Sequence, residues 1–143
     1  MSYLLDVNVL IAVIDEDHVY HDFAKQWFKE KAIKGWATCP ITENGVLRIL
    51  SNPSYGLPDL EPGAIAHYLQ RLKEMFIQHI FIADDYSILD GTIDLESLIH
   101  HKQLTDAYLI GLAYRHKLKF VTFDRKIKRV YLPDKNADVI ERL

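Results

Sequence analysis

The chain has 143 residues, 49% of them hydrophobic and 26% charged, which is ordinary for one globular domain. Its formal net charge of −3 argues against a simple cationic coat for nucleic acid, although it leaves nucleic acid possible as a substrate. A single cysteine, Cys39, excludes a disulfide framework and CxxC metal motifs and fits a reducing cytosol. The apolar stretch from Leu4 to Ile14 is interrupted by Asp6 and Asn8 and has no basic leader, so it predicts neither a signal peptide nor a membrane span. We therefore expect one cytoplasmic domain over residues 1–143.

The first half of the chain predicts strands and helices in alternation. Short apolar runs indicate buried strands, and apolar positions spaced i, i+3, i+4, i+7 indicate helices. We expect a strand at Tyr3 to Leu5 that runs into a helix ending near Ile14, a helix over His18 to Ile33 ended by Gly35, a strand at Trp36 to Cys39 closed by Pro40, and a helix capped by Thr42. The proline- and glycine-containing stretch Ser51 to Glu61 is expected to be the longest loop.

The second half continues the alternation. We expect a helix over Pro62 to Ile77, a buried strand at Ile80 to Ala83, a mostly covered helix over Leu104 to His116, a strand at Lys119 to Thr122, and a fifth strand at an edge near Asp138 to Ile140. Strands alternating with helices predict an α/β domain, with a central parallel sheet of four to five short strands and helices on both faces.

Four carboxylates fall where such a sheet forms its crevice. In open α/β sheets, ligands bind beyond the carboxyl ends of the strands. Asp6 and Asp124 each follow a short apolar strand, Glu43 lies in the first turn of the next helix, and Asp106 lies near the start of a largely buried helix. We call these residues the four acids, and we expect them to face one crevice.

Four converging carboxylates without basic partners repel one another, and burial adds a desolvation cost. Divalent cations resolve that conflict, and oxygen-only ligands favour Mg²⁺ or Mn²⁺. Such ions activate water and steady a phosphoryl group, which points to phosphodiester hydrolysis. The alternative for each acid alone is a helix cap or a solvated turn residue, and Asp84 and Asp85 fit the strand-end rule equally well.

Polar neighbours of the four acids are candidate supporting residues. An amide or hydroxyl beside each acid could order a water at the ion, although each could equally be a local cap; these residues are Asn8, Thr42, Thr105 and Thr122. The seven histidines show no spacing that indicates a zinc site or a catalytic pair.

Basic residues gather around Asp124. Between Arg115 and Arg129 there are seven basic residues against one acid, so this segment could hold a phosphate backbone, or it could be a solvated helix face. The candidate nucleic-acid contacts are Arg48, Arg115, Arg125 and Lys126, and Arg48 could also be an ion-pair partner.

Four segments together resemble a known family. They are LLDVNVLIAVI at Leu4 to Ile14, GWATCPITENGVLRILSNPSY at Gly35 to Tyr55, HKQLTDAYLIGLA at His101 to Ala113, and FVTFDRKI at Phe120 to Ile127. In this order they resemble the VapC-type PIN-domain ribonuclease toxins of bacterial toxin–antitoxin pairs, and most of all the subgroup common in mycobacteria. The resemblance implies a metal-dependent endoribonuclease of the bacterial cytoplasm, with the four acids as its catalytic and metal-binding residues.

The same resemblance implies an Mg²⁺ or Mn²⁺ site, an RNA substrate, a cognate antitoxin that blocks the site, and assembly into homodimers or larger complexes. It carries over no specific residue between Ser51 and His100. An amphipathic helix or strand of the antitoxin is expected to bind in a groove.

Two other functions stay open at this point. A haloacid-dehalogenase-type phosphatase needs a second aspartate two residues after Asp6, where this chain has Asn8. A degenerate PIN-like module that binds RNA or protein without catalysis is disfavoured because all four acids are present.

Overall fold

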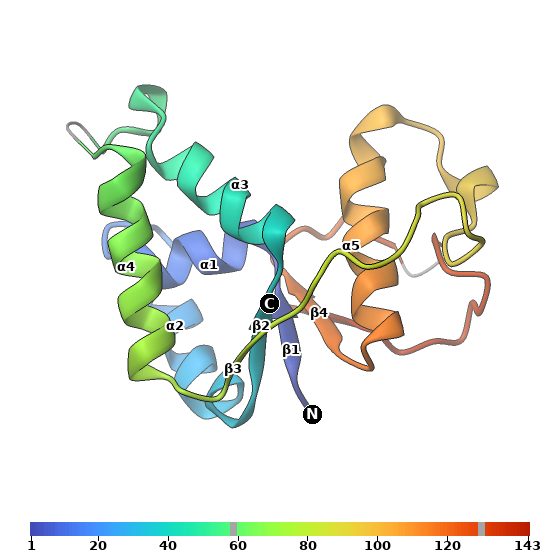
Figure 1. Ribbon diagram of the computed structural model, residues 1–143, viewed down its shortest axis with the longest axis horizontal. Helices are drawn as coiled ribbons and strands as arrows, with labels where there is room; N and C mark the ends of the chain where they lie inside the picture. Colours follow the sequence, from blue (N-terminus) through green and yellow to red (C-terminus); the bar gives the residue numbers. More distant parts are fainter. Residues whose placement is uncertain (58–59, 129–130) are drawn as a thin grey trace.

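The computed structural model describes residues 1–57, 60–128 and 131–143, in which five parallel strands alternate with five α-helices (Figure 1). The strands are β1 (Tyr3–Leu5), β2 (Trp36–Thr38), β3 (His79–Phe81), β4 (Lys119–Thr122) and β5 (Ile140–Arg142). The helices are α1 (Val7–Ile14), α2 (His21–Glu30), α3 (Pro40–Leu50), α4 (Pro62–Met75) and α5 (Leu104–Arg115). The predicted α/β class and the parallel sheet are confirmed.

The sheet separates two hydrophobic clusters. Helices α1 to α4 lie on one side of it and α5 lies on the other (Figure 1). Because side chains alternate across a strand, Leu4 packs toward α5 while Leu5 packs toward the helices of the opposite face. Both residues are fully buried, as are Phe120 and Val121 of β4, which divide in the same way.

The strand order places a switch point at the centre of the sheet. The order is β3-β2-β1-β4-β5, so the chain builds outward from β1 in one direction and then returns to add β4 and β5 on the other side. The crevice of a parallel sheet forms beyond the carboxyl ends of the strands at such a reversal. Here it lies beyond the ends of β1 and β4, the two strands that Asp6 and Asp124 follow.

Several sequence predictions are corrected at the edges of elements. The third strand is an edge strand rather than a buried one, since Ile80 and Phe81 are 47% and 53% exposed. Pro40 begins α3, as its fixed φ angle allows, so Cys39 and not Thr42 is the cap. The edge strand predicted near Asp138 exists as β5 but begins at Ile140.

The connections also differ from expectation. The longest irregular stretch joins β3 to α5 and contains short 3₁₀ turns, including Leu95–Ser97 and His101–Gln103. The predicted loop between α3 and α4 contains the turn Pro53–Tyr55, and its positions 58 and 59 lie outside the described residues. None of the helices in the described ranges is long and apolar enough to cross a membrane.

Candidate active site

Asp6 lies at the switch point and is held by two hydrogen bonds. It is the N-cap of α1, where its Oδ1 accepts from the Val7 N–H at 2.7 Å. Its Oδ2 accepts from the Thr122 hydroxyl at 2.6 Å. The residue is only 7% exposed, and this burial raises its pKa although both hydrogen bonds oppose the rise. The carboxylate is therefore fixed in position and poorly hydrated.

Thr122 and Asn8 join Asp6 to Asp124. The Thr122 hydroxyl accepts from the Asp124 N–H at 3.0 Å and from Asn8 Nδ2 at 3.3 Å, while it donates to Asp6. Asn8 Oδ1 in turn accepts from the Phe123 N–H at 3.2 Å. The two polar residues thus fix the end of β4 against the start of α1, which holds the Asp6 carboxylate and the backbone of Asp124 in place.

Asp106 approaches from the opposite helix layer. It lies in the first turn of α5 and is partly buried. Burial raises its pKa to about 6, and the negative charges of Asp6 and Asp124 add to the rise. The charge of Asp124 likewise raises the pKa of Asp6, so these three carboxylates influence one another, and we call them the aspartate group.

A cavity of about 400 Å³ opens beside the aspartate group. It is lined by Asp106 and Asp124, by Lys126, and by Tyr131 and Gln103 among others. Tyr131 is buried, and burial together with the charges of Asp106 and Asp124 raises the pKa of its hydroxyl. Tyr131 could not be predicted from the sequence, because it follows Asp124 in a segment without helical or strand periodicity.

Glu43 pairs with residues outside the aspartate group. Its Oε1 accepts from the Thr38 hydroxyl at 2.5 Å and from Nζ of Lys73 on α4. The Thr38 hydroxyl has one proton, which it gives to the carboxylate, so His79 Nε2 at 2.7 Å is the donor to Thr38. Burial lowers the pKa of His79 to about 4, with Lys73 as a second cause, so its ring is neutral. Three of the four acids, Asp6, Asp106 and Asp124, thus influence one another electrostatically, whereas Glu43 pairs with Lys73.

The donor chemistry of the aspartate group suits a hard divalent cation. As they stand, no three Asp, Glu, His or Cys side chains within residues 1–57, 60–128 and 131–143 lie close enough to bind one ion. The group nevertheless offers only carboxylate oxygens, and its charges repel one another in a partly buried crevice. Mg²⁺ and Mn²⁺ prefer this kind of ligand, and either would relieve the repulsion.

Comparisons with known proteins decide the family. The PIN domain family model matches residues 3–132. The chain belongs to the PIN-domain family. It is 42% identical to Ribonuclease VapC44 of Mycobacterium tuberculosis over 93% of each chain. It is 40% identical to Ribonuclease VapC38 of the same organism, over 85% of this chain and 84% of that one.

A solved structure shares the PIN-domain fold. It is described as a toxin-antitoxin complex from Klebsiella pneumoniae, and it matches with a TM-score of 0.61 at 20% identity, over 98% of this chain and 96% of that one. The predicted resemblance to VapC-type PIN domains is thus confirmed, and a haloacid-dehalogenase fold is not supported.

The remaining predicted residues of this PIN domain lie apart from the aspartate group or serve the backbone. Thr42 is buried and its hydroxyl accepts from the Cys39 N–H at 3.0 Å, so it stabilises the start of α3. Thr105 and Arg48 are exposed, on α5 and α3. Arg115, at the far end of α5, contacts Asp90 at 3.6 Å.

The basic segment is divided by the fold. A four-residue strand carries the chain about 13 Å, so the residues before β4 lie at the opposite edge of the sheet from Asp124. Lys119, the first residue of β4, pairs with Asp138 at 3.0 Å. Arg125 and Lys126 follow β4 and lie on the side of the site, whereas Arg129 lies outside the described residues. Of the predicted RNA contacts, only Arg125 and Lys126 are neighbours of Asp124.

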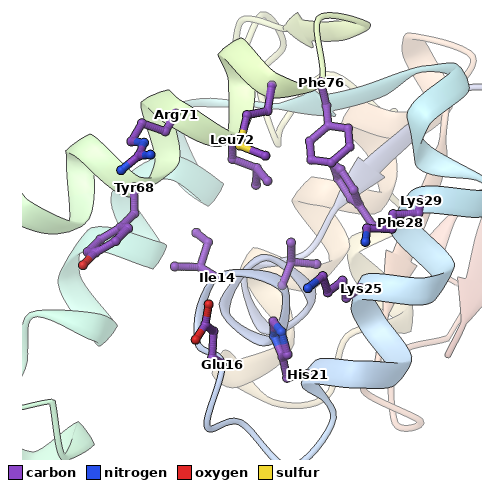
Figure 2. A pocket seen from close by; sticks show the side chains of 12 residues that line it. Ile14, Glu16, His21, Lys25, Phe28, Lys29, Tyr68, Arg71, Leu72 and Phe76 are labelled. Carbon is purple, nitrogen blue, oxygen red and sulfur yellow. The ribbon is translucent and has the colours of Figure 1, made fainter.

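A separate hollow of about 420 Å³ contains none of the four acids. It lies among α1, α2 and α4, with an apolar floor that includes Ile14, Phe28, Leu72 and Phe76 (Figure 2). Charged side chains stand around it, three of them basic and one acidic: Lys25, Lys29, Arg71 and Glu16. This hollow therefore combines an apolar floor with a mostly basic border.

Proposed function

We propose that this protein is a metal-dependent endoribonuclease that acts as the toxin of a toxin–antitoxin pair. The observation that carries the proposal is the aspartate group, in which like charges interact in a partly buried crevice at the switch point of a PIN-domain sheet. The names of the relatives VapC44 and VapC38 support RNA as the substrate, and the complex from Klebsiella pneumoniae supports an antitoxin partner.

Mg²⁺ or Mn²⁺ is the proposed cofactor, and the aspartate group is proposed to hold it. When bound, such an ion activates water and stabilises the charge that develops on the phosphoryl group. Glu43 is the proposed fourth ligand. Because Lys73 already neutralises its carboxylate, we expect Glu43 to contribute least to ion affinity.

The chain's own side chains prepare this site for RNA. Thr122 and Asn8 hold the Asp6 carboxylate and the backbone of Asp124 in place, so these groups need little reorganisation when substrate arrives. Lys126 lines the same cavity and offers a positive charge to an incoming phosphate. The site thus has one positively charged side chain beside the carboxylates, and we propose that it contacts the RNA backbone.

Cleavage of RNA tests the enzymatic proposal. The purified protein should fragment a single-stranded RNA when Mg²⁺ or Mn²⁺ is present, and excess EDTA should stop the reaction. Cleavage that continues at full rate in EDTA would refute the metal dependence. RNA binding without any cleavage at any divalent ion concentration would instead favour a degenerate binding module.

The cognate antitoxin is proposed to bind the hollow among α1, α2 and α4. In an amphipathic segment, apolar residues would contact the floor of this groove, and acidic residues would pair with its three basic side chains. We also propose the homodimers or larger complexes that the VapC resemblance implies.

Charge reversal in the groove tests this partner assignment. Arg71→Glu should weaken binding of the antitoxin by about tenfold or more in a calorimetric titration, since one attraction becomes a repulsion. His67→Glu, at an exposed position on the same helix, is the matched control. Equal affinities for both variants and the wild type would place the antitoxin elsewhere.

A further inference from the structure

We propose that Tyr20, Phe23 and Phe123 form a stacking platform that holds one unstacked base of single-stranded RNA beside the aspartate group. This inference rests on the proposed ribonuclease function and names a subsite of it. We call the three rings the aromatic platform.

The rings gather although they come from distant parts of the chain. Tyr20 and Phe123 are stacked, with ring centroids 5.0 Å apart and ring planes at 18°. Phe23 lies in the first turn of α2, and its ring centroid is 6.3 Å from that of Phe123, with the two ring planes at 53°. Together with Arg125 and Leu143 these rings line a hollow of about 310 Å³. A shallow aromatic recess with one cation is the shape and chemistry that a base and its phosphate require.

The exposure of this platform needs an explanation. Tyr20 is 51% exposed and Phe23 is 55% exposed, while most large aromatic residues of the chain pack into the two clusters. Single exposed apolar side chains are common, but a contiguous patch of them usually marks a binding surface. Aromatic faces stack any base, which makes them a common platform for single strands.

The platform is continuous with the candidate active site. Phe123 stands between Thr122 and Asp124 in sequence, and its N–H donates to Asn8 at 3.2 Å. The hydrogen-bond network that holds Asp6 therefore also fixes the backbone of Phe123, which carries one ring of the platform. A base on these rings would place its own backbone near the carboxylates.

Charge favours nucleic acid as the occupant. Arg125 lines the aromatic hollow and Lys126 lines the cavity of the aspartate group, so two successive cations bridge the two recesses. A strand whose base stacks on the platform would meet these cations with its phosphates. Bases in a duplex are already stacked on each other, so the platform should favour single strands.

Binding of RNA by an inactivated protein tests the inference. Fluorescence anisotropy would measure the affinity of a labelled single-stranded oligonucleotide for Asp106→Asn protein, with and without Phe23→Ala or Tyr20→Ala. Each platform change should weaken binding by about 5- to 100-fold, the usual effect of losing one stacked base. Tyr20→Phe should retain the affinity because it keeps the ring. Tyr114→Ala, at a 44% exposed tyrosine on α5, is the matched control.

The outcomes separate this inference from the proposed function. Melting temperatures would first show that each variant is folded. If Tyr20→Ala does not fold, Phe23→Ala alone tests the inference. Wild-type affinity in folded platform variants would overturn the inference, even if wild-type protein cleaves RNA. Weaker antitoxin binding or dimerisation with unchanged RNA binding would also overturn it and assign the platform to a protein interface. A wild-type protein that neither binds nor cleaves RNA would overturn the proposed function as well.

Discussion

At the scale of single residues, the aspartate group explains why this sheet edge suits an ion. Asp6 and Asp124 could be predicted from the sequence because each follows a short apolar strand, and strand ends meet at one edge. The pairing of Glu43 with Lys73 could not, because it depends on how α4 packs beside α3. Sequence spacing places a residue on an element, but it does not show which neighbour that residue contacts.

Ion binding should be visible in thermal stability. Without divalent ions, Asp106→Asn should raise the melting temperature, since it removes one of three repelling charges. Mn²⁺ should stabilise the wild type by about 2.7 kcal/mol at a hundred times its dissociation constant, and this gain should vanish in Asp106→Asn. Glu43→Gln should keep most of it. Differential scanning fluorimetry measures all three.

The control for this experiment is Asp84→Asn, which changes an exposed acid that follows β3. It should match the wild type with and without Mn²⁺. An ion-induced shift of wild-type size in Asp106→Asn would show that the aspartate group does not hold the ion.

His79 makes stability depend on pH. Its pKa is about 4 in the folded protein against 6.5 for an ordinary histidine, so the unfolded chain binds a proton first as the pH falls. Stability should therefore be constant for this group above pH 6.5 and decrease between pH 6.5 and 4. Thermal unfolding across this range should show a shallower decrease for His79→Gln than for the wild type. His67→Gln, exposed on α4, should retain the wild-type slope.

At the scale of elements, α1 and α3 approach closely where the start of α1 meets the middle of α3. A Cβ added at Gly45 of α3 would lie 2.7 Å from a methyl group of Val7, the first residue of α1. Gly45→Ala should therefore force the helices apart and destabilise the protein by about 1 to 3 kcal/mol. Urea unfolding monitored by circular dichroism gives this difference.

Gly63 supplies the matched comparison. It lies in the first turn of α4, and a Cβ there would meet no atom within 4 Å. Gly63→Ala should be neutral or slightly stabilising, because alanine loses less backbone entropy than glycine. Destabilisation of Gly45→Ala no greater than that of Gly63→Ala would show that the contact with Val7 is not the cause.

The helices and strands with a strong apolar pattern could be predicted from the sequence, whereas the exposure of the edge strand β3 could not. The spacing of α5 and the apolar run of β4 identify both elements within one residue, since burial on several sides imposes a strong pattern. The third strand was expected to be buried because Ile80 and Phe81 are apolar, yet it pairs on one side only and both residues are exposed. Pairing partners decide whether an apolar strand is covered, and the sequence does not specify them.

At the scale of the whole molecule, the net charge of −3 is the sum of acidic and basic side chains that gather in different places. Acidic side chains gather at the switch point, while Arg125 and Lys126 stand next to them and the basic groove among α1, α2 and α4 lies apart. The two hollows share no lining residue, so the proposed substrate site and the proposed partner site occupy different surfaces of one domain.

The rate of RNA cleavage by Asp106→Asn protein decides whether the aspartate group is the catalytic centre. Losing an outer-shell partner of a metal ligand costs about 10- to 100-fold, so loss of a ligand in the aspartate group should cost at least about 100-fold at saturating Mg²⁺ or Mn²⁺. Asp84→Asn should cleave at the wild-type rate. Cleavage by folded Asp106→Asn protein at the wild-type rate would contradict the account.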